Sequence, residues 1–409
     1  ALFARLYGES RVEAQRDRYC EAAAAFIDTF GEAEELVLFS APGRTEIGGN
    51  HTDHNHGRVL AASVNLDVIA VAAPRADGRV RVKSKGYDMD EVSLDDLDVR
   101  DAEKNHSAAL VRGTAARFAQ LGYRVGGFDA YTTSNVLKGS GLSSSAAFEV
   151  LVGTVLSHVY NDGAISAVEI AQIGQYAENV YFGKPCGLMD QMASSVGGLV
   201  FIDFADPAHP AVRQAAFDFA HCGYTLCTLD SGADHADLTD EYAAIPEEMR
   251  RVARVFGKDV LREVDEAEFY AKLKAAREAA GDRAVLRAMH FFDENRRVQQ
   301  QVQALERDDF EGFLAGVRDS GRSSWLLLQN EVPAGSRENQ QMALALAACE
   351  KQLAGRGACR IHGGGFAGTL LAFVPNEALA SFRANMEAVL GEGRCHVLSI
   401  RQAGGVRLA

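Results

Sequence analysis

Residues 139–147 read Gly-Ser-Gly-Leu-Ser-Ser-Ser-Ala-Ala, and this stretch carries most information about the fold. Its two glycines precede three serine hydroxyls, and residues 143–160, which follow, have the composition of a buried helix. Glycine lets backbone approach a ligand, and the first N–H groups of a helix lack partners within it, which favours a bound anion. No Gly-Lys-Ser/Thr follows, so this is not a Walker A loop. The pattern predicts a phosphate site, with a plain serine N-cap as the alternative.

Helical and strand patterns alternate on both sides of this stretch. Helices are expected over the first thirty residues and over residues 166–181, 241–329 and 378–390. Strands are expected at residues 36–39, 59–73, 79–84, 128–134, 199–204, 224–229, 369–374 and 395–401. This order predicts a mixed α+β protein of two lobes, divided between residues 204 and 222.

Charge and cysteine usage exclude several classes of protein. A formal net charge of −14 argues against a nucleic-acid or anionic-membrane surface, since both need clustered Lys and Arg. No stretch approaches the roughly 20 apolar residues of a membrane span. The seven cysteines form no C-x-x-C pair, which speaks against a disulfide framework and a zinc knuckle. A reducing cytoplasm is therefore expected.

Residues 41–57 carry an unusual polar load between two apolar strands. They include one Arg, two acids, three His and four Gly, and a loop is expected here. Metal binding is the alternative, through His51, Asp53, His54 and His56. Their spacing fits no familiar zinc pattern.

Two further segments are candidates for a site. Glu178 lies near the end of a predicted helix, in a column of small residues with Ala171 and Gly174. Asp190 follows a turn rich in Gly and Pro within an apolar context, where a helix cap and a catalytic acid or base are equally consistent. Residues 362–368, His-Gly-Gly-Gly-Phe-Ala-Gly, form a glycine-rich loop between two strands.

These four segments together resemble the galactokinases of the GHMP small-molecule kinase superfamily. Residues 139–147 are similar to the superfamily's phosphate loop, and residues 178–191 to a stretch ending Pro-Cys-Gly-Ile-Met-Asp-Gln. Residues 41–57 resemble the galactokinase signature, usually Gly-Arg-Val-Asn-Leu-Ile-Gly-Glu-His-Thr-Asp-Tyr-Asn, and residues 362–368 the Gly-x-Gly-Phe-Gly-Gly motif. Segments 231–242 and 287–297 also look like the family, so the resemblance spans roughly residues 35 to 408.

Some residues depart from these family patterns. Asn50 stands where the family has Glu, and His54 stands where it has Tyr. The remaining departures are Thr45, Glu46 and Gly48 within the signature, Leu137 in place of a proline before the phosphate loop, and Asp234 in place of a basic residue.

The resemblance implies an α+β fold of two lobes with the active site between them. A ribosomal-protein-S5-like domain would cover residues 1–212, and a ferredoxin-like domain residues 213–409. The implied reaction is ATP-dependent phosphorylation of the C1 hydroxyl of galactose, giving galactose 1-phosphate and ADP. The expected ligands are a free sugar, ATP and Mg²⁺, with no nucleic acid and no membrane. The expected assembly is a monomer or a weak homodimer.

The resemblance also assigns roles to residues. Asp190 would take the proton from the C1 hydroxyl, and Arg44 would pair with Asp190 and offset charge on the transferred phosphoryl group. Ser145 and Glu178 would hold Mg²⁺. ATP phosphates would rest on Gly139, Ser140, Gly141, Leu142, Ser143, Ser144 and Ser145. The sugar would contact Asn50, His51, Asp53, Gly187, Asp190 and Tyr242, with Asn50 at the C6 end.

Two alternatives to galactose phosphorylation remain open. Neutral Asn50 would repel a C6 carboxylate less than Glu would, so galacturonate is an alternative substrate, as is arabinose, which lacks C6. On this reasoning, Asn50→Glu would sharpen selectivity for galactose. The other alternative is a sugar sensor without activity, disfavoured because the phosphate loop, Arg44, Glu178 and Asp190 are all present.

Overall fold

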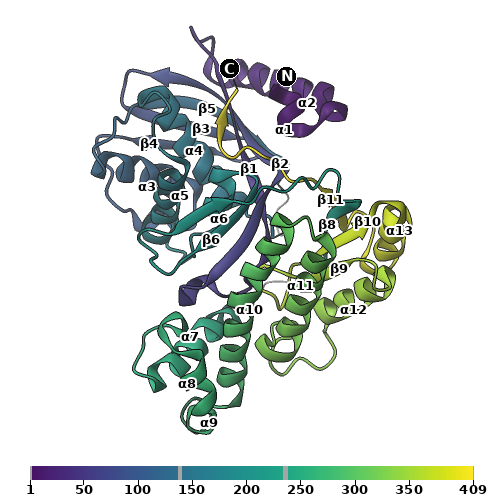
Figure 1. Ribbon diagram of the computed structural model, residues 1–409. Helices are drawn as coiled ribbons and strands as arrows, with labels where there is room; N and C mark the ends of the chain where they lie inside the picture. Colours follow the sequence, from purple (N-terminus) through teal and green to yellow (C-terminus); the bar gives the residue numbers. More distant parts are fainter. Residues whose placement is uncertain (1, 137–140, 234–237, 409) are drawn as a thin grey trace.

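The computed structural model of the protein describes residues 2–136, 141–233 and 238–408 (Figure 1). The predictions made for Leu137, Gly139, Ser140 and Asp234 therefore lie outside the described residues.

The larger sheet contains most strands of the N-terminal half. Among the described residues it has eight strands in the order β12-β1-β2-β5-β3-β4, with β6 paired to β2 and β7 paired to β6. Its pairs are antiparallel except β3 with β5. The strands are β1 (Val37–Gly48), β2 (Arg58–Arg75), β3 (Arg79–Ser84), β4 (Met89–Ser93), β5 (Gly127–Ser134), β6 (Leu199–Asp203), β7 (Ala211–Gln214) and β12 (Val406–Arg407).

Strand β1 runs through half of the segment that was expected to be a loop. It pairs with β2 as far as Gly48 opposite Leu60, with shifts in register between Pro42 and Arg44 and between Glu46 and Gly48. The loop prediction for residues 41–48 is therefore wrong. The polar residues here are buried inside the molecule, where the pairing with β2 satisfies their backbone.

Helices cover both faces of this sheet. Alternate residues of β2 point to opposite faces. Val68, Ala70 and Ala72 share a core with α4, whereas Ile69, Val71 and Ala73 pack on α1 and α2. The helices of this lobe are α1 (Leu2–Tyr7), α2 (Val12–Phe30), α3 (Ser107–Gln120), α4 (Ser144–Tyr160), α5 (Ala167–Tyr176) and α6 (Met189–Val196).

The smaller sheet is antiparallel, with the order β11-β8-β10-β9. On β10, Leu370, Ala372 and Val374 pack with α12 and α13, while Leu371 and Phe373 face α11 and join the core of the larger sheet. The two sheets therefore share one continuous core. Its elements are β8 (Tyr224–Asp230), α11 (Phe310–Ser323), α12 (Gln341–Leu353), β9 (Ala358–His362), β10 (Thr369–Pro375), α13 (Leu379–Leu390) and β11 (Cys395–Leu398).

A helical unit at the lower end of Figure 1 completes the fold. Helices α7 (Thr239–Val255), α8 (Glu266–Ala271), α9 (Leu273–Ala280) and α10 (Asp282–Glu306) share a separate core, and α10 continues upward to contact β1 and β2. The helical prediction for residues 241–329 is confirmed. No helix of the described chain is long and apolar enough to cross a membrane. The division at residue 212 stays a prediction.

Candidate active site

Arg44 and Asp190 form a bidentate ion pair. Arg44 lies on β1, and Asp190 lies in the first turn of α6. Arg44 Nε lies 2.6 Å from Asp190 Oδ1, and Nη2 lies 2.7 Å from Oδ2. Arg44 also donates Nη1–H to the carbonyl of Gly141 and its backbone N–H to that of Leu142, the latter at 3.0 Å. The ion pair is thus held against the end of the residue 139–147 stretch.

The surroundings of Asp190 keep its carboxylate ionised. Burial alone raises its pKa, but the charge of Arg44 and hydrogen bonds from Arg44 and Ser143 outweigh that effect and hold the pKa below its ordinary value. The side chain is 29% exposed, so a ligand can reach it. Leu188 occupies the N-cap of α6, which makes the interpretation of Asp190 as a helix cap wrong.

The start of α4 has the features of an anion site. Ser143 occupies the N-cap with φ 56°, but its side chain makes no capping bond and instead bonds to Asp190. The plain N-cap interpretation is therefore wrong, since the side chain of Ser143 does not cap the first N–H groups of α4. Gly141 has φ +70°, and a Cβ there would lie 2.7 Å from Thr369 Oγ1, so glycine is required.

A cavity of about 700 Å³ opens beside the first turn of α4. The cavity is lined by residues of β3, β5, α3 and α4 and of their connecting loops. These residues are widely separated in the chain, so the cavity could not be predicted from the sequence. The lining residues include Lys85, Tyr87, His106, Leu110, Thr133, Asn135, Ser144, Ser145, Phe148 and Phe182.

Glu178 lies within hydrogen-bonding distance of the phosphate-loop candidate Ser145. It is in a π-helical turn, Ala177–Phe182, that continues α5. Ser145 Oγ lies 3.3 Å from Glu178 Oε1, Gln191 donates to Oε2 at 2.8 Å, and Lys184 Nζ lies 3.6 Å from Oε1. Gln191 also donates to the buried Glu149 at 2.9 Å. Gly174, one of the small residues in the predicted column, leaves space for the side chains of Glu149 and Gln191.

Two of the predicted sugar-binding residues, Asp53 and Gly187, are in contact. Asp53 lies against Gly187, where any side chain would collide with Asp53 Oδ2. Burial is the main cause that raises the pKa of Asp53 to about 6; a hydrogen bond from the His54 N–H opposes the shift, and the charges of Glu46 and Asp190 add to it. His51 Nε2 donates to the carbonyl of Gly364 at 2.9 Å, which brings the glycine-rich loop to the same place.

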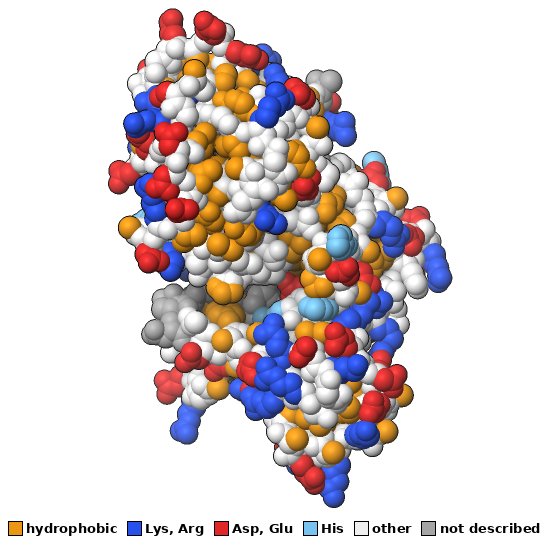
Figure 2. All heavy atoms as spheres, turned by 90° about the vertical axis from the view of Figure 1, so that its left-hand side faces the viewer, with side chains coloured by type: hydrophobic (Ala, Val, Ile, Leu, Met, Phe, Trp, Pro, Cys, Tyr) orange, Lys and Arg blue, Asp and Glu red, His pale blue; other side chains and the backbone are white. Residues whose placement is uncertain are grey.

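Tyr242 reaches this place from α7. Its hydroxyl donates to the carbonyl of Gly365 at 3.0 Å, and burial raises its pKa to about 12. Figure 2 shows the surface hollowed between the upper and lower parts of the molecule, with histidine side chains nearby.

The metal alternative for residues 51–56 finds no support. His51 Nδ1 is hydrogen-bonded to His54 Nε2 at 3.2 Å, and burial lowers the pKa of His51 to about 4. Nowhere in residues 2–136, 141–233 and 238–408 do three or more His, Cys, Asp or Glu side chains gather as a metal site.

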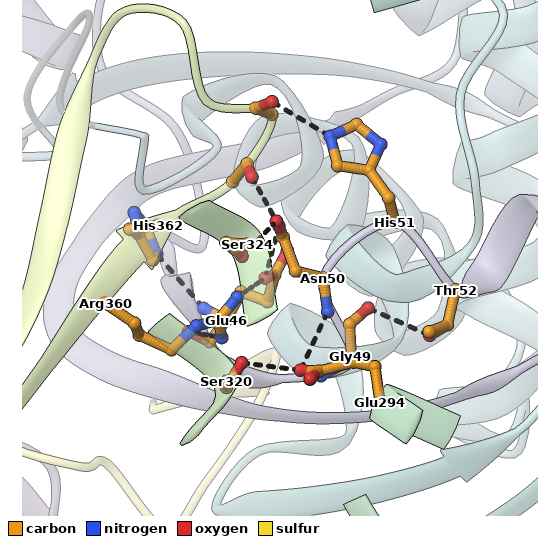
Figure 3. Close-up of polar contacts among 12 residues, drawn as sticks. Glu46, Gly49, Asn50, His51, Thr52, Glu294, Ser320, Ser324, Arg360 and His362 are labelled. Carbon is orange, nitrogen blue, oxygen red and sulfur yellow. Dashed lines mark hydrogen bonds and ion pairs between the residues drawn. The ribbon is translucent and has the colours of Figure 1, made fainter. Parts of the chain in front are cut away.

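Asn50 is fully buried, and its amide is satisfied by the protein (Figure 3). Nδ2 donates to Glu46 Oε1 at 3.0 Å and to the carbonyl of Gly363 at 2.6 Å. Oδ1 accepts from Asn330 Nδ2 at 3.0 Å and from Ser324 Oγ at 3.4 Å. This arrangement leaves the amide no hydrogen-bonding capacity for a sugar.

Glu46 joins the two lobes. Its carboxylate pairs with Arg360 of β9, whose side chain is fully buried. Burial raises the pKa of Glu46, and the charge of Arg360 opposes that shift. Beside this pair, Glu294 accepts from Gly49 N–H at 2.9 Å and from Ser320 Oγ at 2.7 Å (Figure 3). Sequence reasoning assigned no role to Glu46, Arg360 or Glu294.

Two family models match the chain. The galactokinase galactose-binding signature matches residues 24–74, and the GHMP kinases N terminal domain matches residues 109–198. The galactokinase of Glaesserella parasuis serovar 5 is 34% identical over 373 residues, covering 88% of this chain and 90% of the relative. The galactokinase of Streptomyces coelicolor is 32% identical over 354 residues, covering 85% and 87%.

Solved structures share the fold. The galactokinase of Lactococcus lactis, solved in complex with galactose, superposes with a TM-score of 0.82 and 24% identity, covering 95% of this chain and all of that one. A mevalonate kinase superposes with a TM-score of 0.61 and 12% identity, covering 89% and 98%. The expected two-lobed α+β GHMP kinase fold is thereby confirmed.

Proposed function

Because the chain belongs to the galactokinase family, we propose that it transfers the γ-phosphoryl group of ATP to the C1 hydroxyl of galactose, giving galactose 1-phosphate and ADP. One observation carries this proposal. An ionised, ligand-accessible carboxylate, Asp190, is fixed by Arg44 directly beside the start of α4, where the side chain of Ser143 makes no capping bond. A proton acceptor is thereby held next to a phosphate site, as direct phosphoryl transfer to a hydroxyl requires.

Each residue of this arrangement has a distinct role. Asp190 accepts the C1 hydroxyl proton as the C1 oxygen bonds to the γ-phosphorus and ADP leaves. Arg44 keeps Asp190 ionised and oriented, and its guanidinium offsets charge on the transferred group. ATP phosphates rest on residues 141–145 and the N–H groups of α4, and the adjoining 700 Å³ cavity takes the rest of the nucleotide.

Mg²⁺ fits the oxygen donors beside the phosphate loop. Ser145 Oγ and Glu178 Oε1 are 3.3 Å apart, and Mg²⁺ usually takes one or two protein oxygens, completing its shell with phosphates and water. We assign Ser145 and Glu178 to hold it. When bound, the ion would neutralise negative charge on the β- and γ-phosphates.

Glu178→Gln is expected to raise the Mg²⁺ concentration for half-maximal activity by about tenfold or more, because a charged ligand becomes neutral. The apo protein should melt at the same temperature or higher, since the change removes a charge beside buried Glu149. Mg²⁺ titration of activity and thermal melting measure both. Glu149→Gln is the matched control and should leave the Mg²⁺ requirement unchanged. Equal Mg²⁺ curves for Glu178→Gln and wild type would give Glu178 a structural role instead.

We assign His51, Asp53, Gly187 and Tyr242 to the sugar site, together with Asp190; the contacts of Asp53 with Gly187, and of His51 and Tyr242 with the loop at Gly364 and Gly365, support this assignment. The test is a panel of free sugars with MgATP, scored by ADP release. Galactose should be the preferred substrate, with galacturonate and arabinose at least about tenfold poorer in kcat/KM. ADP release with none of the sugars would favour the sensor. The monomeric or weakly dimeric state and the cytoplasmic location stay predictions.

The pKa of Asp53 predicts how galactose binding depends on pH. Its carboxylate accepts hydrogen bonds only when ionised, and its pKa is raised to about 6. As the pH falls through about 6, Asp53 becomes protonated and KM for galactose should rise. Asp53→Asn should have a high KM with little dependence between pH 5 and 8, which steady-state kinetics would measure. A wild-type KM that is flat over this range would remove Asp53 from sugar binding.

A further inference from the structure

We propose that Glu46, not Asn50, recognises the C6 hydroxyl of the sugar, with its Oε2 atom as the acceptor. This inference rests on the proposed function and names the residue that decides specificity at the end of the sugar away from C1. Four observations carry it: the bonding of Asn50, the position of Glu46 on β1, the carboxylate oxygen of Glu46 that accepts no hydrogen bond from the described residues, and the hydrogen bond between Glu46 and Asn50.

The side-chain amide of Asn50 has no free donor or acceptor for a ligand. Both Nδ2 hydrogens face acceptors, Glu46 Oε1 and the carbonyl of Gly363, which fixes the orientation of the amide. The Asn50 backbone carbonyl accepts from His290 Nε2 at 2.9 Å. A sugar hydroxyl could reach the amide only by breaking buried hydrogen bonds and leaving their partners unsatisfied.

Glu46 lies on the same face of β1 as Arg44. It follows Arg44 by two residues on β1, and residues so spaced share one face of a strand. After burial itself and a backbone hydrogen bond from His54, the charges of Glu46 and Asp190 are the next causes of the shifted pKa of Asp53. Because Arg44 pairs with Asp190, Glu46 lies on the side of β1 that faces this ion pair, and it is near enough to Asp53 for their charges to interact.

Within the described part of the chain, only one carboxylate oxygen of Glu46 accepts a hydrogen bond. Oε1 accepts from Asn50 Nδ2 at 3.0 Å and from Arg360 Nη2 at 2.5 Å (Figure 3). Oε2 receives no hydrogen bond from any residue that the structure describes, and the side chain keeps 5% of its surface exposed. A carboxylate so placed can take one further donor, and a sugar hydroxyl supplies one.

Glu46 and Asn50 have exchanged the residue types of the usual signature. That pattern has Asn at the position of Glu46 and Glu at the position of Asn50. In this chain the two side chains are hydrogen-bonded to each other. The exchange therefore shifts the carboxylate from position 50 to position 46, and the pair still contains one carboxylate and one amide. A charged acceptor for C6 is thus retained, and a C6 carboxylate is still repelled.

Wild-type protein allows a first test that needs no mutation. We expect kcat/KM for galactose to exceed that for 6-deoxygalactose by about tenfold or more, the value of one hydrogen bond to a charged group. The 6-deoxy-6-fluoro analogue should be as poor as the 6-deoxy sugar, since fluorine cannot donate to Oε2. Fluoro-sugar turnover equal to that of galactose would overturn the proposal. If no sugar of this set is phosphorylated, the proposed function itself has failed.

Glu46→Gln supplies the second test, with Glu294→Gln as a matched control in the same buried network. Glu46→Gln should reduce the galactose to 6-deoxygalactose ratio to about twofold while kcat/KM for 6-deoxygalactose changes little. Glu294 accepts from the backbone N–H groups of Gly49 and Asn50 and from Ser320, and it pairs with Arg297. Since none of these bonds involves the Glu46 carboxylate, the Glu294 variant should leave that ratio unchanged, whatever its melting temperature. Equal losses for both sugars in Glu46→Gln would make Glu46 a purely structural residue and overturn the assignment.

Discussion

Asp190→Asn is expected to lower kcat by about 10²–10⁴-fold while galactose still binds. Asn keeps the shape of the side chain but has no basicity, so the C1 hydroxyl loses its proton acceptor. Arg44 now donates to both carboxylate oxygens of Asp190, at 2.6 and 2.7 Å. In the variant an NH₂ group replaces one of these oxygens, and this group cannot accept a hydrogen bond from Arg44. Single-turnover kinetics with MgATP and calorimetric titration with galactose separate the chemical step from binding.

Ser143→Ala is the control for this prediction. It removes a hydrogen bond to Asp190 but leaves the carboxylate and its ion pair with Arg44. We expect a loss of about tenfold or less in kcat, the value of one hydrogen bond to a charged group. Near-wild-type kcat in Asp190→Asn would refute the assignment of Asp190 as the base. A loss of galactose binding as large as the loss of kcat would give Asp190 a role in binding only.

The residues that could be predicted from the sequence are those whose chemistry is local. Gly141 to Ser145 show two properties of an anion site within one short stretch, a glycine and the start of a helix. Asp190 was identified as a candidate because an acid in an apolar context is unusual, although the sequence could not separate a helix cap from a base. The contact with Arg44, 146 residues away, separates them.

The residues that could not be predicted depend on distant partners. Arg360 pairs with Glu46 across 314 residues, and nothing near Arg360 in the sequence indicates a buried counter-charge. The same cause explains the wrong loop prediction for residues 41–48. Polar residues there indicated solvent, whereas they face partners inside the protein, such as Asp190 and Arg360. The short strand β12 returns to pair with β1 without any local pattern.

Asn50→Glu is expected to destabilise the protein, contrary to the sharpened selectivity expected from the sequence. The new carboxylate would lie where Nδ2 now donates to Glu46 Oε1, at 3.0 Å, and to the carbonyl of Gly363. It would place two carboxylates side by side in a buried site, with only Arg360 left to donate to Glu46 Oε1, and would remove the amide donor to the carbonyl of Gly363. An uncompensated buried charge typically costs about 3–5 kcal/mol. Urea unfolding monitored by far-UV circular dichroism should show this as a clear fall in midpoint.

The double variant Glu46→Asn/Asn50→Glu tests whether Glu46 and Asn50 are energetically coupled, so that the effect of one substitution on stability depends on the other. Glu46→Asn alone leaves the fully buried Arg360 without its partner and should cost a similar amount. The double variant again holds one carboxylate and one amide, in the order of the usual family signature, so the new carboxylate can accept from the amide at position 46. If the pair is a unit, the double variant regains most of the stability lost by the single variants, with a coupling energy above about 2 kcal/mol. If the two losses simply add, Glu46 and Asn50 are independent, and their exchange relative to the family has no structural consequence.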